Sequence, residues 1–502
     1  MTISIYPYSK NNRLTSMQSD YVKKEHISKL DNWLPEHYFC NKNRLQNVIK
    51  HWTTLDKLHA QVIDGWRFSE NRESGWYQKN IMHVQKNLKA NYRQLHTAER
   101  YEQAIKQSLF YRMRHIESMK LQIDSHLMRA PAVDNLTACV KEGDVLVRRI
   151  GTICACIVSS FHRQHPVDAN IAIIRGLEIN WATWLGFCLN QSYYRHFLEQ
   201  LTSSKTMLRV GVKHLEQLPV AEMPKAFFPL ARAYHDQYNN FAYIEQRLYN
   251  LRLSVSTWVK EKLSGTESYI FNNNQSIKYK FVKPQHINDQ LTHAASWQAQ
   301  LSEELISVYN CQRLFKLAII NPQSDNRSQS LEQEPVIKIS NINSQLAISE
   351  PEKDFGWRTL KSTVKPLDVL ISTFVQEPKV AIVTRKIKNQ PLVSEQLAIL
   401  RFHHAPGAYA LLMETDLVKE QMQALAHGTS QRFIQHKMLE QIVIPELEQT
   451  VANAWHQELI DILDKIEKVE LEISDVLAQM YSVYRTIHPE QRLIRSSNEP
   501  IH

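Results

Sequence analysis

The stretch WHQELIDILDKIEKVELEISDVLAQMYSV, residues 455–483, carries apolar side chains at alternating spacings of four and three. This heptad pattern is typical of a helix that packs along another helix. We therefore predict one long helix over about 448–487 with an apolar seam along one face. The seam residues are Trp455, Leu459, Ile462, Ile466, Val469, Ile473, Val476, Met480 and Val483.

A second seam in the same register lies earlier in the chain, with Leu230 in the place of Trp455 and Trp258 in the place of Val483. It predicts another long helix over about 224–263, whose seam would span roughly 43 Å at 1.5 Å per residue. Gln237 is the polar member of this seam. Its apolar members are Leu230, Tyr234, Phe241, Ile244, Leu248, Leu251, Val255 and Trp258.

Short segments in front of each seam also recur, in the same order. The difference in residue number between matching positions, the repeat offset, hardly varies along the chain, which indicates an internal duplication with small loop changes. The repeated unit is a strand-rich domain followed by a long helix. The recurring pairs are Val140–Val147 with Val364–Ile371, Ile171–Arg175 with Leu397–Arg401, and Leu215–Leu218 with Leu439–Ile442.

These patterns predict an α+β chain in which two β-rich domains alternate with two long helices that pair with each other. The predicted segments are an N-terminal extension and start of the first domain at 1–105, the first domain at 106–222, the first helix at 224–263, a linker at 264–277, the second domain at 278–446, the second helix at 448–487 and a flexible tail at 488–502.

The composition favours a soluble protein with an anionic partner. Sixty Lys and Arg against 51 Asp and Glu give a net charge of +9, which suits a polyanion such as nucleic acid. The six cysteines show no paired C-x-x-C spacing, as expected in a reducing cytoplasm. The sequence has no signal peptide and no apolar run of membrane-spanning length, so we expect a cytoplasmic protein.

The sequence lacks the motifs of several enzyme classes that act on nucleic acids. An adenine methyltransferase needs an Asn/Asp-Pro-Pro-Tyr-like motif and a glycine-rich cofactor loop, and neither occurs. No P-loop, paired-carboxylate nuclease site or zinc-ligand spacing is present. His403-His404 and the pair His162 and His165 favour surface or turn roles over metal binding. We predict a non-catalytic chain that binds no cofactor and no metal itself.

Asp144 and Asp368 recur at the entry to a strand in each half. A catalytic role is conceivable for a repeated carboxylate. An Asp that follows a turn more commonly accepts a hydrogen bond from its own backbone, so a structural role is favoured.

Basic residues near the strand ends and before short helices are the candidate DNA contacts. Arg can grip guanine with two hydrogen bonds and Lys neutralises phosphate, whereas a solvated charge cluster is the alternative for each residue. Hydroxyls in Thr202–Lys205 and Gly428–Arg432 stand before a helix start, which favours phosphate, although capping alone explains them. The candidates are Arg148, Arg149, Arg163, Lys205, Arg209 and Lys213 in the first half, and Arg385, Lys386, Lys388, Arg432 and Lys437 in the second.

The order of these motifs resembles the specificity subunit of type I restriction-modification enzymes. The matching residues cover about 110–263 and 336–487. They are Gly143-Asp144-Val145-Leu146 with Gly151-Thr152, Leu215–Pro219, and the copies Asp368–Ile371 and Leu439–Pro445, each set followed by a seam.

The resemblance implies a function as well as a fold. Each strand-rich domain would be a target recognition domain that reads one half of a bipartite double-stranded DNA target, and the helices would form an antiparallel coiled coil. DNA adenine methyltransferase (modification) subunits, two of them, would dock on the helices and bind S-adenosylmethionine. A restriction/translocase subunit would join for cleavage, and no membrane is involved.

The sequence departs from the family pattern at three places. Leu367 stands where the family has a glycine, Gln376-Glu377-Pro378 replaces Gly-Thr, and the first hundred residues differ. These departures leave open a divergent member of the family, from another methylation-linked phage-defence system.

Two hypotheses from other functional classes remain open. One is a non-DNA structural adaptor with two protein-binding domains on a coiled-coil spacer. The other is a degenerate enzyme whose site lies in residues 1–105. Salt distinguishes the first of these from DNA recognition, because phosphate contacts make affinity fall steeply with salt.

Overall fold

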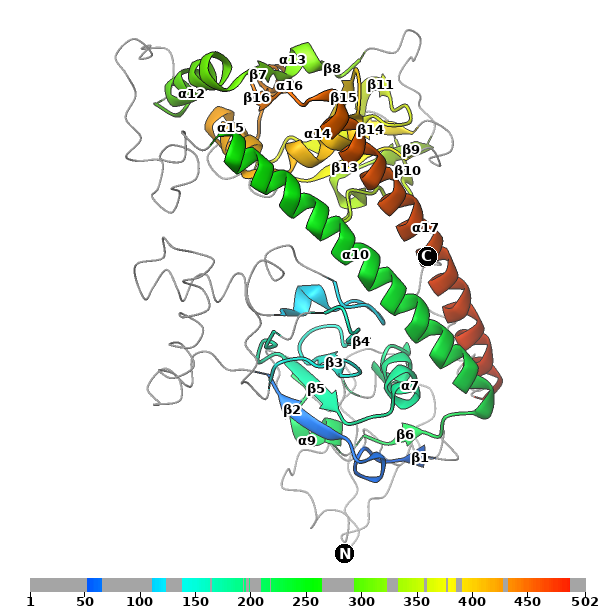
Figure 1. Ribbon diagram of the computed structural model, residues 1–502. Helices are drawn as coiled ribbons and strands as arrows, with labels where there is room; N and C mark the ends of the chain where they lie inside the picture. The colour runs from blue at the N-terminus through cyan, green and yellow to red at the C-terminus, as the bar shows by residue number, and fades with distance from the viewer. Residues whose placement is uncertain are drawn as a thin grey trace, which may run out of the picture. The chain divides into compact units, whose positions relative to one another are not determined.

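The computed structural model divides the chain into two compact units (Figure 1). Unit 1 comprises residues 1–243 and 469–502, and unit 2 comprises residues 244–468. The structure describes residues 52–65, 111–122, 138–162, 165–192, 194–195, 198, 209–216, 218–263, 293–322, 333–355, 359–375, 378–384, 391–427 and 432–487. The predicted linker 264–277 and tail 488–502 lie outside these ranges.

Unit 1 is built on a four-stranded antiparallel sheet with strand order β2-β5-β3-β4. A short antiparallel pair, β1 with β6, joins the two ends of the domain. The first domain therefore includes strands from residue 52 onward, well before the predicted start of its main part at 106. The strands are β1 Trp52–Thr53, β2 Gln61–Asp64, β3 Val145–Arg148, β4 Ala155–Ile157, β5 Ile171–Arg175 and β6 Val220–Ala221.

The central strand β3 is buried on both faces. Val145, Leu146 and Val147 are all fully buried, which explains the continuous β-branched and aliphatic run in the sequence. On one face Leu146 packs into an apolar cluster with Tyr111 and Ile173. Helix α7 (Ile179–Leu189) packs on β3 and β4. Further short helical segments in the described part of unit 1 are η1 Asp56–Leu58, η2 Met113–His115, α9 Val212–Glu216 and η3 Lys225–Phe227.

Unit 2 contains a sheet of the same order, β8-β15-β12-β13, also antiparallel. Helix α14 (Pro406–Met413) packs on β12 and β13, as α7 does on β3 and β4. The short pair β7 with β16 occupies the place that β1 and β6 take in unit 1. These strands are β7 Cys311–Arg313, β8 Ala318–Ile320, β12 Val369–Ser372, β13 Val380–Ile382, β15 Leu397–Phe402 and β16 Val443–Pro445.

Unit 2 also has elements without a counterpart among the described residues of unit 1. A second four-stranded sheet has the order β10-β9-β14-β11, and helix α12 precedes β7. The sequence analysis did not predict α12. These elements are α12 His293–Tyr309, β9 Gln333–Ile337, β10 Glu352–Phe355, β11 Thr359–Thr363 and β14 Leu392–Ser394. The short helices in the described part of unit 2 are α13 Leu314–Leu317, η7 Ile339–Asn341, α15 Asp416–Leu425 and α16 His436–Leu439, of which η7 and α16 match η2 and α9 of unit 1.

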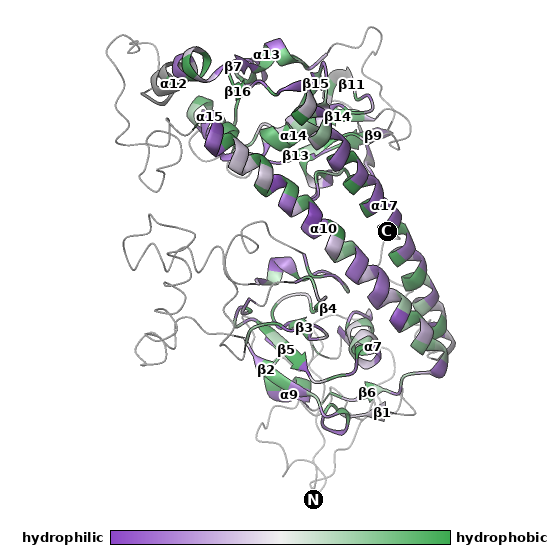
Figure 2. Cartoon of the chain, in the orientation of Figure 1, coloured by the Kyte–Doolittle hydropathy of each residue, from purple (hydrophilic) through white to green (hydrophobic). Residues whose placement is uncertain are grey.

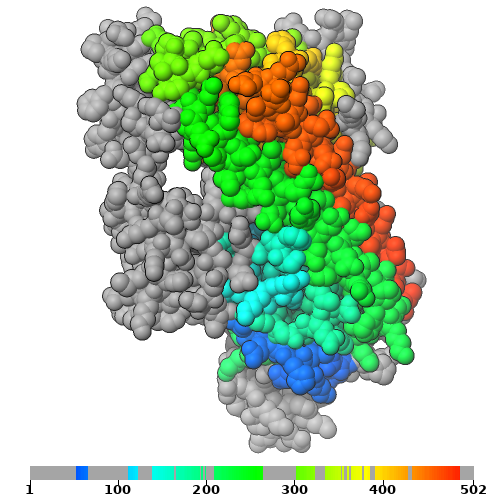
Figure 3. Space-filling model, viewed as in Figure 1, coloured from blue at the N-terminus to red at the C-terminus, as the bar shows by residue number. Residues whose placement is uncertain are grey.

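Two long helices follow the predicted ranges closely. Helix α10 covers Phe228–Lys262 and helix α17 covers Gln449–Ile487. Figure 2 shows hydrophilic and hydrophobic positions alternating along both, and both reach the visible surface in Figure 3. None of the seventeen apolar seam residues is exposed. No helix among the described residues is long and apolar enough to cross a membrane.

Contacts between α10 and α17 are clearest in unit 2. The rings of Trp258 and Trp455 lie 5.5 Å apart, nearly perpendicular. Arg247 Nη2 lies 2.6 Å from Glu458 Oε1 and 3.2 Å from Asp461 Oδ2. Higher residue numbers on α10 thus meet lower numbers on α17.

Candidate nucleic-acid interface

A buried aspartate–arginine pair fixes the start of β3 in unit 1. Asp144 is 2% exposed and accepts a hydrogen bond from the Lys141 amide at 2.7 Å. The Arg175 guanidinium, on β5, donates to both of its oxygens at 2.9 and 2.6 Å. Burial raises the pKa of Asp144, while these hydrogen bonds act in the opposite direction. The backbone bond confirms the structural role predicted for this aspartate.

Unit 2 has the same arrangement around Asp368, which is 1% exposed. The Lys365 amide donates to it at 2.7 Å, and Arg401 Nε and Nη2 donate at 2.8 and 2.7 Å. The preceding residue has a positive φ in both units, +79° for Gly143 and +71° for Leu367. Leu367 therefore keeps the turn that glycine forms in unit 1, in a backbone region that L-residues rarely adopt.

The opposite end of the same strand positions the candidate basic residues. In unit 1 the Arg149 amide donates to Asn170 O, and the Val210 amide donates to Arg149 O, both at 2.9 Å. In unit 2 Thr373 makes the matching bonds with Gln396 and Ile434, also at 2.9 Å. The segments 209–216 and 432–439 are thereby tethered beside the end of β3 and β12.

Lys213 and Lys437 are the exposed cations of these two segments. Lys213 lies on α9 and Lys437 on α16, and two residues later in each helix a leucine, Leu215 or Leu439, is fully buried. The buried leucine anchors the short helix and leaves the lysine directed to solvent. An exposed ammonium group on an anchored helix is suited to neutralise a phosphate.

Arg149 is only 3% exposed, and its guanidinium is engaged inside the domain. Its Nε donates to Val210 O at 2.7 Å, and its Nη1 forms an ion pair with Asp64. A side chain so buried does not reach a nucleic acid. We therefore reassign Arg149 from DNA contact to holding β2 and the 209–216 segment together.

The remaining described candidates are partly buried. Arg209 Nη2 donates to Ala169 O at 3.0 Å, and Arg432 Nη2 donates to Gln423 O at 2.8 Å. Arg148 ends β3. These arginines retain donors beyond their structural bonds, since a guanidinium has five. The other candidates, Arg163, Lys205, Arg385, Lys386 and Lys388, lie outside the described residues.

Sequence reasoning overlooked Arg195 and Lys419, two cations separated by the repeat offset. Each follows the end of the helix on its sheet, and their amides make matching bonds, to Gln191 O at 3.0 Å and to Thr415 O at 3.1 Å. The recurrence of a cation at the repeat offset was the signal that could have found them.

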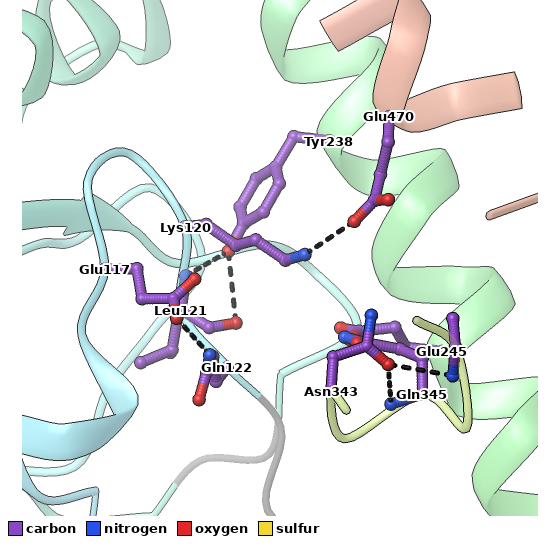
Figure 4. Close-up of polar contacts among 10 residues, drawn as sticks. Glu117, Lys120, Leu121, Gln122, Tyr238, Glu245, Asn343, Gln345 and Glu470 are labelled. Atoms are coloured by element: carbon purple, nitrogen blue, oxygen red, sulfur yellow. Dashed lines mark hydrogen bonds and ion pairs between the residues drawn. The ribbon is translucent and has the colours of Figure 1, made fainter. Parts of the chain in front are cut away.

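Each unit also fastens a loop to the long helices (Figure 4). In unit 1 the Tyr238 hydroxyl, on α10, accepts from the Leu121 amide at 2.7 Å, and Lys120 Nζ lies 3.2 Å from Glu470 on α17. In unit 2 Gln345 Nε2 donates to Glu245, on α10, at 2.5 Å. These contacts join the loop of Lys120 and Leu121 in unit 1, and the loop of Gln345 in unit 2, to the long helices.

This chain is similar to solved structures of other proteins. No family model matches the chain, and no curated protein matches it. One similar structure is a Type-I restriction-modification system S subunit from M. genitalium, 11% identical with a TM-score of 0.33, the match covering 87% of this chain and 95% of that one. Another, described as showing complex assembly and conformational transition of the type I R-M system, is 12% identical with a TM-score of 0.23, covering 77% and 92%.

Proposed function

We propose that the chain is the sequence-specific DNA-recognition subunit of a type I restriction-modification-like methyltransferase complex, and that it is not itself catalytic. The observation that carries the proposal is the repeated module: a buried Asp–Arg pair, a sheet of the same strand order, and a tethered segment that presents an exposed lysine. Lys213 and Lys437 occupy matching places in the two modules. Two such modules on one chain are suited to contact two separate stretches of one duplex.

The same matches support an internal duplication with the helices paired as an antiparallel coiled coil. The boundary between the units cuts α10 after Tyr243 and α17 after Lys468, and these two positions are separated by the repeat offset of the seams. Each unit thus combines one strand-rich domain with half of each helix. Paired helices of fixed length would keep the two target recognition domains at a fixed separation. The DNA target would then be two half-sites with a spacer that neither domain contacts specifically.

We further infer that the helices dock the methyltransferase subunits. Large apolar side chains remain exposed on the described helices: Leu253 on α10 is 42% exposed, Tyr243 is 48% and Leu471 on α17 is 61%. Exposed apolar residues rimmed by polar ones are common at protein interfaces. The partners would be two DNA adenine methyltransferase subunits that bind S-adenosylmethionine, and a restriction/translocase subunit would join them.

An alternative function is a protein-binding adaptor without a DNA target. The observation that favours it is a set of exposed apolar residues in unit 2. Val308 is 64% exposed, Phe315 48% and Ile319 50%. Such residues would suit a protein partner of that unit.

Salt dependence and target mapping separate the two functions. The chain, coexpressed with an adenine methyltransferase subunit with which it assembles, should bind duplex DNA with a steep log–log salt slope, near −0.9 per phosphate contacted. Genomic methylation should then appear at one bipartite motif. Binding that ignores salt, or methylation at no defined motif, would favour the adaptor.

A further inference from the structure

Two arginines of unit 1 place guanidinium groups beside the edge strand β4. Arg148 is the last residue of β3, and Arg195 follows the end of α7. Both side chains are partly buried, and in each the Nε atom is shielded from solvent and has no hydrogen-bond partner. Among the residues that the structure describes, neither guanidinium forms an ion pair.

The backbone brings these two side chains toward Cys154. The Arg148 amide donates to Cys154 O at 2.8 Å, so the two residues are cross-strand neighbours. Asn190 accepts from the Ala155 amide at 3.0 Å and donates to Ala155 O at 2.7 Å. These two hydrogen bonds fix the end of α7 to the start of β4, and the helical turn that follows carries Arg195.

The charges at Cys154 are dominated by the two arginines. Burial raises the pKa of the Cys154 thiol, Arg148 and then Arg195 lower it, and Glu117 raises it by a smaller amount. The Glu117 carboxylate already accepts a hydrogen bond from Gln122 Nε2. Two cations thus act on Cys154 against one carboxylate, Glu117, whose effect is smaller than that of either arginine.

A shielded guanidinium nitrogen without an acceptor is costly to the fold. Buried polar groups are nearly always hydrogen-bonded, and a lost bond to a charged group costs more than one to a neutral group. Because both side chains are only partly buried, an anion with several oxygens can reach their exposed part and offset the charge of each guanidinium through charge-assisted hydrogen bonds. The phosphodiester groups of DNA have this chemistry.

We propose that Arg148 and Arg195 bind two phosphates of the DNA backbone, a pair of contacts that the matching positions of unit 2 keep only in part. The proposal rests on the DNA-recognition function. In unit 2 the matching position of Arg148 is Ser372, whose hydroxyl accepts from the Lys379 amide at 2.9 Å and donates to Phe374 O at 3.2 Å. Only the cation that matches Arg195 is kept, as Lys419.

The test measures duplex binding against salt for the full chain in its methyltransferase complex. The double variant Arg148→Gln/Arg195→Gln should reduce the log–log salt slope by about 1.8 and weaken binding roughly 30-fold at 0.15 M salt. The charge-matched control Lys57→Gln/Lys225→Gln removes two exposed cations from unit 1 that lie outside the long helices and should leave the slope unchanged. Arg148→Lys/Arg195→Lys should restore most of the slope, because the charges return.

The outcomes are distinguishable. If the wild-type complex shows no salt-dependent DNA binding, the proposed function itself fails. If the wild type binds but the Gln variant keeps its slope, or if the Lys variant binds as poorly as the Gln variant, the phosphate contact is overturned while DNA recognition stands. Should the double Gln variant fail to fold by circular dichroism, Arg195→Gln alone should lose about 0.9 from the slope, and an unchanged slope would reject the proposal.

Discussion

Lys120 Nζ lies 3.2 Å from Glu470 Oε1, and Lys120 also sits 3.7 Å from the centre of the Phe241 ring. In unit 1 a single loop residue thus contacts both long helices, because Phe241 is on α10 and Glu470 is on α17. The matching pair in unit 2 is Gln345 with Glu245. Adding the repeat offset to Lys120 leads to Gln345, and subtracting it from Glu470 leads to Glu245. Each strand-rich domain therefore contacts the long helix that does not directly follow it in the chain.

The left-handed turn before each buried aspartate gives a direct test of the duplicated geometry. Gly143→Leu should lower the free energy of unfolding by about 1–2 kcal/mol, because an L-residue pays that much in this backbone region. The space is sufficient, since an added Cβ would meet only Ile179 Cδ1 at 3.9 Å. The reciprocal change Leu367→Gly should have little effect, because relief of strain offsets the greater entropy of the unfolded glycine. Denaturant titration measures both, and equal losses in the two variants would contradict this account.

Removing the buried carboxylate should cost far more than breaking a surface ion pair. Asp368→Ala leaves the Arg401 guanidinium without its two acceptors, and loss of one partner of a buried pair costs about 3–5 kcal/mol. Lys465→Ala is the control, since Lys465 pairs with Asp461 on the exposed face of α17 at 2.7 Å. Such helical pairs contribute about 0.3–0.5 kcal/mol. Thermal melts that showed similar losses for both would mean that the Asp368 pair does not hold the sheet.

Buried His162 should make unit 1 sensitive to acid. The Ser159 amide donates to His162 Nδ1 at 2.9 Å, so Nε2 carries the proton toward Leu121 O at 3.1 Å. Burial lowers the pKa of His162 from 6.5 to about 4. Between these values the unfolded chain binds more protons than the folded one, so stability is complete above pH 6.5 and declines as the pH falls toward 4, by about 3 kcal/mol in all.

The control for this pH dependence is His162→Asn, whose amide oxygen can accept from Ser159 without titrating. Unfolding should be followed by denaturant at a series of pH values between 7 and 4. The variant should be less stable at pH 7 but should lose less stability on acidification than the wild type. Parallel curves for the two proteins would show that His162 is not the titrating group.

The spacing of the two half-sites should follow the length of the helices. Inserting four residues after Tyr243 and four after Lys468, at the boundary between the units, adds about 6 Å of rise and turns each helix by about 400°, so the seams stay nearly aligned. The preferred spacer should lengthen by about one or two base pairs, at 3.4 Å per step. Insertions of two residues turn each helix by about 200° and should abolish assembly. Genome-wide methylation mapping measures the preferred spacer. An altered base preference with an unchanged spacer would contradict the proposal that helix length sets the spacing of the half-sites.

The long helices were readable from sequence because their apolar period is regular over many turns. The strands β3 and β12 were readable because Val145–Val147 and Val369–Ile371 are apolar runs bounded by turns. Helix α12 was not predicted, and neither was the contribution of Gln61–Asp64 to the first sheet, since a four-residue strand that pairs with β5 depends on a partner more than a hundred residues away.

The candidate site was predicted less completely than the fold. The sequence proposed Lys213, Lys437 and Arg149 alike as DNA contacts and could not show that Arg149 is buried. Burial decides that difference, and the acceptors of Arg149, Val210 O and Asp64, come from segments distant in the chain. Arg195 was missed because an isolated cation after an apolar helix has no local signature.

Unit 1 combines segments from the two ends of the chain, which has a consequence for folding during synthesis. Its apolar residue Phe187 packs against Tyr481 and Tyr484, with ring centroids 4.9 and 5.6 Å apart, and these tyrosines lie near the end of α17. While the ribosome is still translating unit 2, this first domain has an uncovered aromatic surface. The domain translated first is therefore the one completed last, and a nascent chain stalled before α17 would present that surface to chaperones.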